Sequence, residues 1–192
     1  MDIYGDLQSG NCLKVKYTAD FLGLIYKWHP IDITKGESQT EAFLRINPTG
    51  QVPVVVLQDG KYLAQSNAII RFLANRTTLL PNSAYEQAKV DEWLFWEQYS
   101  HEPYIAVCRY HMVYLNEPES TREQWRVERG EKALDIMENK LLETQWLAGP
   151  AMTVADIALL SYTRLANEGG FDLSCRPNIQ RWIIECEKNL NL

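Results

Sequence analysis

Apolar positions in the first third of the chain follow a strand spacing in some segments and a helical spacing in others. Aromatic, β-branched and aliphatic residues predict strands over 3–7 and 26–33. Between them, apolar side chains at helical spacing predict a helix over 11–22, which Gly23 ends. A strand, a helix and a second strand in this order predict two parallel strands joined by a right-handed crossover.

The pattern that follows predicts a hairpin and a further helix. Residues 47–50 read Asn-Pro-Thr-Gly, a strong turn signal, and precede an apolar strand over 52–57. Residues 59–60 read Asp-Gly, which predicts a tight turn before a return strand over 61–64. We expect Ser66 to be the N-cap of the next helix. A βαβ unit followed by a ββα unit is the order of a thioredoxin-like domain.

After this domain the chain is polar over 77–84 and then helical. No later segment has a convincing strand pattern, and prolines and glycines separate the helical stretches. The helices are predicted over 85–114 with a bend near Pro103, 120–142, 153–166 and 178–189. The predicted fold is therefore α/β plus all-α: a thioredoxin-like domain at 1–76, a linker at 77–84 and an all-helical domain at 85–192.

One helix start carries a recognisable capping signal. Thr153 and Asp156 have the spacing of a capping box and directly precede an apolar run. We expect the Thr153 hydroxyl to accept a hydrogen bond from the Asp156 amide. This motif predicts a buried helix and needs no catalytic explanation.

Composition narrows the range of partners and compartments. A formal net charge of -6 disfavours nucleic acid or an anionic membrane surface as the main partner. No leader-like start or membrane-length apolar run is present, so we expect a soluble, cytoplasmic protein.

The residues that could bind a metal or form disulfides are few and scattered. The cysteines have no CxxC spacing and are expected to be free thiols: Cys12, Cys108, Cys175 and Cys186. His101 and His111 lack a third ligand at metal spacing, so no metal site is expected.

Four short motifs carry a family resemblance that extends from Tyr4 to Trp182. They lie at 9–15, 47–54, 65–69 and 153–156. On these residues the sequence resembles the cytosolic glutathione transferases, in particular bacterial members with a serine in the N-terminal motif. The resemblance implies glutathione as co-substrate, no metal or organic cofactor, and a homodimer.

Three neighbouring residues are candidates for the contact with the thiol of glutathione. The resemblance implies that the Ser9 hydroxyl donates a hydrogen bond to the sulfur and, with the helix N-terminus, favours the thiolate. In some similar bacterial enzymes an asparagine at the position of Asn11 contacts the sulfur instead, and a cysteine near Cys12 would form a mixed disulfide with glutathione. Each residue also has a structural alternative: Ser9 or Asn11 as helix cap, and Cys12 as a small packing residue.

The resemblance also places the rest of the glutathione site. It implies a cis Val52–Pro53 bond that turns the Val52 backbone toward the cysteinyl part of the ligand, although most X-Pro bonds are trans. Gln65 is expected to bind the ligand's amino group, and Ser66 with its amide the γ-glutamyl carboxylate. Many relatives have glutamate at the position of Gln65, so charge pairing is weaker here. Lys35 and Gln51 are the candidates for the glycyl end.

The second substrate is expected against the first helix of the helical domain, which is dense in aromatic residues. Most of these belong to the core, and the candidates that face the substrate are Tyr104, Cys108 and His111. The expected function is conjugation of the glutathione thiolate to small hydrophobic electrophiles, as in detoxification. The alternatives are a glutathione-dependent disulfide reductase or peroxidase, supported by Cys12, and a non-catalytic glutathione-binding module.

Overall fold

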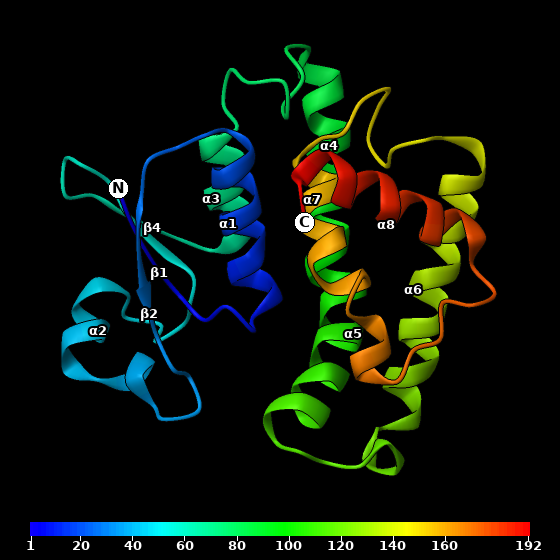
Figure 1. The fold of residues 1–192 in the computed structure, drawn as a ribbon, viewed down its shortest axis with the longest axis horizontal. Helices are drawn as coiled ribbons and strands as arrows, with labels where there is room; N and C mark the ends of the chain where they lie inside the picture. Colours follow the sequence, from blue (N-terminus) through cyan, green and yellow to red (C-terminus); the bar gives the residue numbers. More distant parts are fainter. The chain divides into compact units, whose positions relative to one another are not determined.

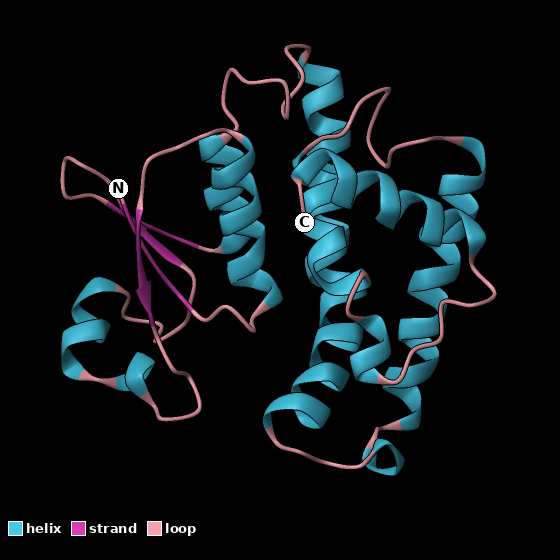
Figure 2. Cartoon of the chain, in the orientation of Figure 1, coloured by secondary structure: helices cyan, strands magenta, loops and turns pink.

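The computed structural model describes all 192 residues, which divide into two compact units, Met1–Asn75 and Arg76–Leu192. Strands occur only in the first unit, and the second is helical (Figure 2). The α/β plus all-α prediction is confirmed. The segment expected to be a linker, 77–84, falls within the second unit, where Leu79 and Leu80 are buried.

The first unit is built on a four-stranded mixed sheet of order β2-β1-β3-β4. The strands are β1 (Asp2–Gly5), β2 (Lys27–Pro30), β3 (Val54–Val56) and β4 (Tyr62–Ala64). β1 and β2 are parallel, as the strand–helix–strand pattern predicts, and the other two pairings are antiparallel. Each strand is shorter than the apolar run that predicts it, because only part of each run pairs with a neighbour.

Helices cover both sides of this sheet. α1 (Gly10–Phe21) and α3 (Ser66–Leu73) pack together on one side, and α2 (Glu41–Ile46) lies on the other, after the short 3-10 turn η1 (Glu37–Gln39) (Figure 1). The core between sheet and helices consists of fully buried aliphatic side chains, including Ile3, Val15, Val54, Val55, Ile69 and Ile70. Burial of such side chains is the main stabilisation of the layered arrangement.

The start of α3 differs from the prediction. Gln65 occupies the N-cap position, with φ 71° and ψ 111°, and Ser66 is the first helical residue. Because Ser66 is inside the helix, its hydroxyl is directed elsewhere, to the side chain of Asn11.

The second unit contains five α-helices. They are α4 (Ala84–Trp96), α5 (Glu102–Arg109), α6 (Gln124–Glu143), α7 (Val154–Thr163) and α8 (Pro177–Leu190), with the 3-10 turns η4 (Glu119–Thr121) and η5 (Ala166–Gly169). Every residue of α7 is buried, and this helix contacts α4, α5 and α8. A helix that is buried on all sides belongs at the centre of such a bundle.

The helix predicted over 85–114 is interrupted just before Pro103 by a π-helical turn. η2 (Glu97–His101) separates α4 from α5, and a second π-helical turn, η3 (Tyr110–Tyr114), follows α5. Proline has no amide hydrogen to donate within a helix, and the wider π turn before Pro103 accommodates that loss.

The capping motif at α7 anchors the interior of the second unit. The Asp156 carboxylate accepts hydrogen bonds from the Thr153 amide at 2.9 Å, the Leu147 amide at 3.0 Å and the Trp182 indole at 2.9 Å. The capping box predicted for Thr153 and Asp156 is present in both directions, and the Thr153 hydroxyl also accepts from the amide of Ala155 at 3.2 Å. Burial raises the pKa of Asp156, against the effect of these hydrogen bonds.

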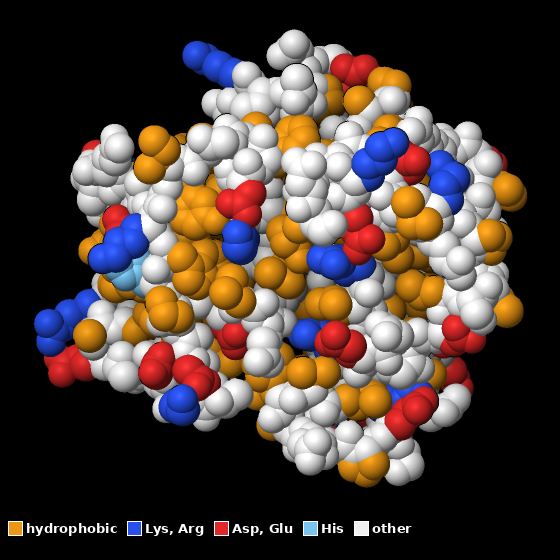
Figure 3. Space-filling model, viewed as in Figure 1, with side chains coloured by type: hydrophobic (Ala, Val, Ile, Leu, Met, Phe, Trp, Pro, Cys, Tyr) orange, Lys and Arg blue, Asp and Glu red, His pale blue; other side chains and the backbone are white.

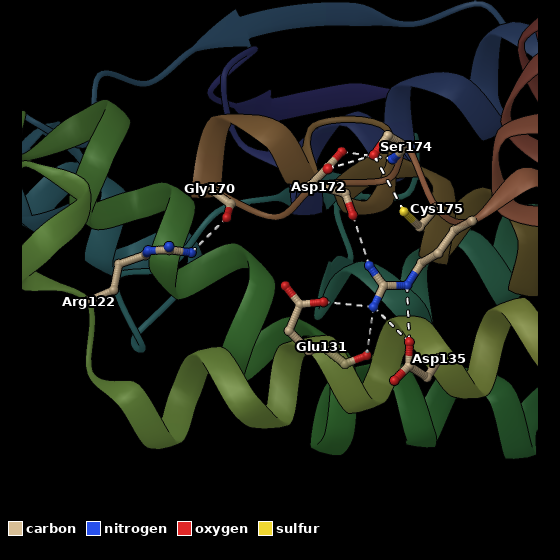
Figure 4. Close-up of polar contacts among 8 residues, drawn as sticks. Arg122, Glu131, Asp135, Gly170, Asp172, Ser174 and Cys175 are labelled. Carbon is tan, nitrogen blue, oxygen red and sulfur yellow. Dashed lines mark hydrogen bonds and ion pairs between the residues drawn. The ribbon is translucent and has the colours of Figure 1, made fainter.

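A polar cluster fastens α8 to α6. The Arg176 guanidinium, just before α8, donates at 2.7 Å to both Glu131 and Asp135 of α6 and at 2.8 Å to the carbonyl of Asp172 (Figure 4). Glu138 of α6 accepts from the first amides of α8, those of Asn178 at 3.1 Å and Ile179 at 2.9 Å. A carboxylate from one helix thus caps the N-terminus of another.

The face of the molecule in Figure 3 has no single dominant charge. Acidic and basic side chains are interspersed over the face shown in Figure 3. None of the helices is long and apolar enough to cross a membrane.

Candidate functional site

Three predicted motifs of the first unit meet at one edge of the sheet. Antiparallel pairing places Tyr4, near the end of β1, opposite Val54 at the start of β3, and Val54 opposite Ala64 at the end of β4. The loop after β1, the residues before β3 and the residues after β4 therefore lie at the same edge. These segments contain Ser9, Asn11, Val52, Pro53, Gln65 and Ser66.

Two of these motifs are in direct contact. The Ser66 hydroxyl donates a hydrogen bond to Oδ1 of Asn11 at 3.0 Å, although the residues are 55 positions apart. The ammonium group of Lys14, a fully buried residue of α1, lies 3.5 Å from the same hydroxyl oxygen and donates to it. Sequence reasoning did not select Lys14. The available signal was a lysine between Leu13 and Val15, one helical turn after Asn11.

Ser9 stands at the N-cap position of α1 but does not cap the helix with its side chain. Its backbone is extended, its amide donates to the Asp6 carbonyl at 3.1 Å, and the residue is half-buried. The hydroxyl lies close enough to the Cys12 thiol to hydrogen-bond with it. The capping alternative for Ser9 therefore has no hydrogen bond to support it.

Cys12 is enclosed by the protein. The side chain is fully buried, and its sulfur accepts a hydrogen bond from the Asp6 amide at 3.3 Å. Burial raises the pKa of the thiol to about 12, against the opposing effect of the hydrogen bonds from Asp6 and Ser9. Only the thiolate is a strong nucleophile, so Cys12 is unreactive at neutral pH.

The Val52–Pro53 bond is cis, in agreement with what the resemblance implies. Val52 is half-buried and lies before β3 begins, outside the paired part of the sheet.

The loop before Val52 is organised by the buried Asn47. Its Nδ2 donates to the Gln51 carbonyl at 2.7 Å, and its Oδ1 accepts from the Thr49 hydroxyl at 3.0 Å. Gly50 has φ +64°, and a Cβ there would lie 2.5 Å from Nε2 of Gln39. Only glycine fits this position without displacement of its neighbour. The sequence pattern identified Asn47 and Gly50 as a turn but not as the support of the site.

Gln65 has an unusual backbone for a residue with a side chain. Its φ of 71° lies in a region that costs about 1–3 kcal/mol, and such residues concentrate at functional sites. The side chain is exposed, and the first amides of α3 follow it directly. Amides in the first turn of a helix have no partner within the helix and form a positive end for an anion.

The two residues expected at the glycyl end are both exposed. The Lys35 ammonium forms an ion pair with Asp32 at 2.9 Å, and this contact raises the pKa of Lys35. Hydrogen bonds from Thr34 and Lys35 lower the pKa of the Asp32 carboxyl. The backbone carbonyl of Gln51 is held by Asn47, which leaves the exposed side chain to face solvent.

The candidates for the second substrate lie in the second unit, and the structure brings two of them together. Cys108 of α5 and His111 of η3 line one small cavity with Arg122 and Arg126. Burial raises the pKa of the Cys108 thiol, which is only 2% exposed.

The other contacts of these candidates are with α6 and the loop before it. The Nδ1 of His111 is 2.8 Å from the Glu117 carboxylate. Tyr104 instead packs edge-on against Trp125, with ring centroids 6.2 Å apart.

No group of three or more His, Cys, Asp or Glu side chains is arranged to hold a metal ion. The groups that could bind a ligand or take part in a reaction are the hydroxyl, amide and backbone groups at this edge of the sheet. Together with the order of elements, they define a two-domain protein of the thioredoxin-like class with a helical second domain.

Comparison with known proteins identifies the family within that class. The family model "Glutathione S-transferase, N-terminal domain" matches residues 8–76, and "Glutathione S-transferase, C-terminal domain" matches residues 98–189. A crystal structure of a glutathione S-transferase from Pseudomonas fluorescens Pf-5 is 49% identical, with a TM-score of 0.93, and the match covers 97% of this chain and 94% of that one. A second, from Xanthobacter autotrophicus Py2, is 40% identical with a TM-score of 0.92, over 97% of this chain and 92% of that one.

A curated plant relative agrees with these matches. Glutathione S-transferase 3 of Zea mays is 29% identical over 95% of this chain and 86% of its own length. The chain belongs to the glutathione transferase family.

Proposed function

We propose that this enzyme conjugates the thiolate of glutathione to small hydrophobic electrophiles. The observation that carries the proposal is the meeting of Ser9, the cis Val52–Pro53 bond and Gln65–Ser66 at one edge of the sheet in the first unit. Family membership indicates the class of reaction, and we assign glutathione binding and catalysis in this chain to these residues.

Glutathione binds along this edge by three sets of contacts. The first amides of α3 hold the γ-glutamyl carboxylate, and the exposed Gln65 side chain takes the amino group. The backbone of Val52 pairs with the cysteinyl part of the ligand as an added strand would. Lys35 and Gln51 bind the glycyl end, where Lys35 exchanges its ion pair with Asp32 for the ligand carboxylate.

The reaction requires the thiol of glutathione as a thiolate. The Ser9 hydroxyl donates to the sulfur near the N-terminus of α1, with the Asn11 amide as a second donor. The thiol proton passes to solvent, and a sulfur–carbon bond forms as the leaving group departs with its bonding electrons. Each unit by which the bound thiol pKa falls corresponds to about 1.4 kcal/mol of preference for the thiolate.

The electrophile contacts the second unit. Tyr104 and His111 are partly exposed, whereas Cys108 is buried beneath the surface of α5. We therefore assign the contact with the electrophile to Tyr104 and His111, with Cys108 as part of the wall of the small cavity. The aromatic ring of Tyr104 offers an apolar contact that does not depend on one particular electrophile, which suits a role in detoxification.

Homodimerisation and a cytoplasmic location complete the proposal. Large aromatic side chains are exposed in both units, with Tyr62 56% and Phe72 50% exposed in the first and Phe95 76% and Tyr99 82% exposed in the second. Phe95 and Tyr99 are one helical turn apart and present an apolar strip. Apolar surface of this kind supports association with a second copy of the chain.

The burial of Cys12 favours conjugation over a cysteine-based reduction. A disulfide reductase that uses Cys12 would need an accessible thiolate, and this thiol is buried and protonated. The non-catalytic alternative predicts no turnover even when glutathione binds.

Steady-state kinetics with chlorodinitrobenzene as electrophile test the proposal. Loss of a hydrogen bond to a charged sulfur costs about 1.5–3 kcal/mol, so Ser9→Ala should lower kcat/KM about 10- to 100-fold. Ser83→Ala is the matched control, because Ser83 is also an N-cap serine without a side-chain cap hydrogen bond, in the second unit. Wild-type activity in Ser9→Ala would transfer the role to Asn11, and no conjugation by the wild-type protein would refute the proposed function.

A further inference from the structure

The buried side chain of Asn47 makes its hydrogen bonds within the loop that precedes Val52. Asn47 is 5% exposed and follows the last residue of α2, where its amide donates to the Phe43 carbonyl at 2.9 Å. On one arm of the side chain, Oδ1 accepts from the amide and the hydroxyl of Thr49 at 3.3 and 3.0 Å. On the other arm, Nδ2 donates to the Gln51 carbonyl at 2.7 Å. Both arms of this buried amide are therefore engaged by the loop itself.

The bond to the Gln51 carbonyl also sets the direction of the Val52 amide, because both groups belong to one peptide unit. That unit is trans, since the cis bond of the chain is the next one, Val52–Pro53. In a planar trans unit the C=O and N–H bonds point in opposite directions. The Gln51 carbonyl points to the buried Asn47, so the Val52 amide points away from it.

The Val52 amide has no acceptor within the chain. It makes no backbone hydrogen bond and lies outside the sheet ladder, which begins at Val54. A backbone donor left in this state takes its partner from outside the chain, from water or from a ligand. Because Val52 is half-buried, its amide is a donor at the site where glutathione is proposed to bind.

The contact with Asn47 is the hydrogen bond by which the chain holds this peptide unit. No other group donates to the Gln51 carbonyl, and the unit lies in the loop between α2 and β3. The two backbone torsions on either side of a peptide unit are its soft degrees of freedom. Without the Nδ2 donor the unit is free to rotate about them, which would turn the Val52 amide away from the ligand.

We infer that Asn47 is a positioning residue, which holds the Gln51 carbonyl and so directs the Val52 amide toward the cysteinyl carbonyl of bound glutathione. This inference rests on the proposed function, in which the Val52 backbone pairs with the cysteinyl part of the ligand. Asn47 acts on binding rather than on the thiol, because Ser9 and the N-terminus of α1 are the groups assigned to the sulfur.

Calorimetry with S-methylglutathione measures binding without ionisation of the thiol. Asn47→Ala should raise its Kd about 3- to 10-fold, as expected for the loss of one neutral hydrogen bond. Asn47→Asp should have a similar effect, because it keeps the shape and the acceptor for Thr49 but lacks the Nδ2 donor. Thr49→Val leaves the Nδ2 contact in place and should change the Kd less than about twofold.

A modified ligand separates this role from a purely structural one. An S-methylglutathione analogue with a trans-alkene in place of the cysteinyl–glycyl amide has no carbonyl for the Val52 amide to reach. The wild-type protein should bind this analogue about 3- to 10-fold more weakly than S-methylglutathione. Asn47→Ala should bind the two ligands almost equally, because the misdirected amide has already lost the contact. A mere loss of stability would lower the midpoint of urea denaturation and leave this difference between ligands unchanged.

The kinetic counterpart is a split between KM and kcat. In Asn47→Ala the KM for glutathione should rise, whereas kcat at saturation should change less than about twofold. Asn189→Ala is the matched control, because its Nδ2 also donates at 2.7 Å to a carbonyl four positions away, that of Glu185, but in the second unit. This variant should leave both Kd values and KM unchanged, and circular dichroism verifies the fold of each variant.

Two results would overturn the inference. One is an unchanged Kd for S-methylglutathione in folded Asn47→Ala and Asn47→Asp; the other is an equal loss of affinity for the alkene analogue in the wild-type protein and Asn47→Ala. A wild-type protein that does not bind S-methylglutathione, or that binds it no better than the alkene analogue, would instead refute the proposed mode of glutathione binding, and the inference with it. The two kinds of failure are therefore distinguishable.

Discussion

The reactivity of the buried Cys12 thiol tests whether the reactive sulfur of this site is that of glutathione or that of Cys12. Its pKa of about 12 lies three units above the ordinary value of 9.0, so at a given neutral pH it holds about a thousandfold less thiolate than an unperturbed cysteine. The fully buried side chain also restricts contact with reagents. Native Cys12 should therefore neither react with iodoacetamide nor form a mixed disulfide with oxidised glutathione.

The assay is peptide mass spectrometry after treatment of the folded protein. Cys175 is exposed and serves as the internal positive control, whereas Cys108 and Cys186 are buried and should also stay unmodified. Because the pKa of Cys12 is raised, its thiolate fraction should grow about tenfold per pH unit until the pH approaches 12. Cys12→Ala should retain conjugation. A glutathione adduct on native Cys12 at neutral pH, or loss of turnover in folded Cys12→Ala, would refute this reasoning.

Three further substitutions test other parts of the structure. Asp156→Ala leaves four buried donors without this acceptor and should lower the free energy of unfolding by about 4 kcal/mol in urea denaturation; an effect below about 1 kcal/mol would contradict the network. Glu138→Ala removes the cap of α8 and should cost about 1–2 kcal/mol, whereas the exposed Glu143 at the end of the same helix α6 offers a control that should cost little. Gln65→Gly should stabilise the protein by about 1 kcal/mol, because glycine tolerates positive φ, yet raise KM for glutathione; a fall in both stability and KM would oppose the assigned role.

The order of elements could be predicted from the sequence because the spacing of apolar residues changes between strand-like and helical where the secondary structure changes. The parallel β1–β2 pair, the hairpin and the helical second unit all follow from that pattern. Local signals also located the cap at α7. They were less accurate at element ends, where pairing and packing decide the boundary: Ser66 is inside α3 rather than its cap.

The parts of the site that depend on tertiary contacts could not be read from the sequence. A lysine in a helix is usually solvated, whereas Lys14 is fully buried beside Ser66, a residue 52 positions away. The backbone of Gln65 is likewise set by its surroundings, since no propensity favours positive φ for glutamine. Cys12 was an open candidate for the thiol chemistry until its burial was known.

The central claim is that the edge of the sheet in the first unit binds glutathione and stabilises its thiolate. The most direct measurement is a pH titration of thiolate absorbance for glutathione bound to the wild-type protein, compared with free glutathione. The account predicts that the thiol pKa falls by at least about one unit on binding, equivalent to about 1.4 kcal/mol. A bound thiol that titrates at the same pH as free glutathione would contradict it.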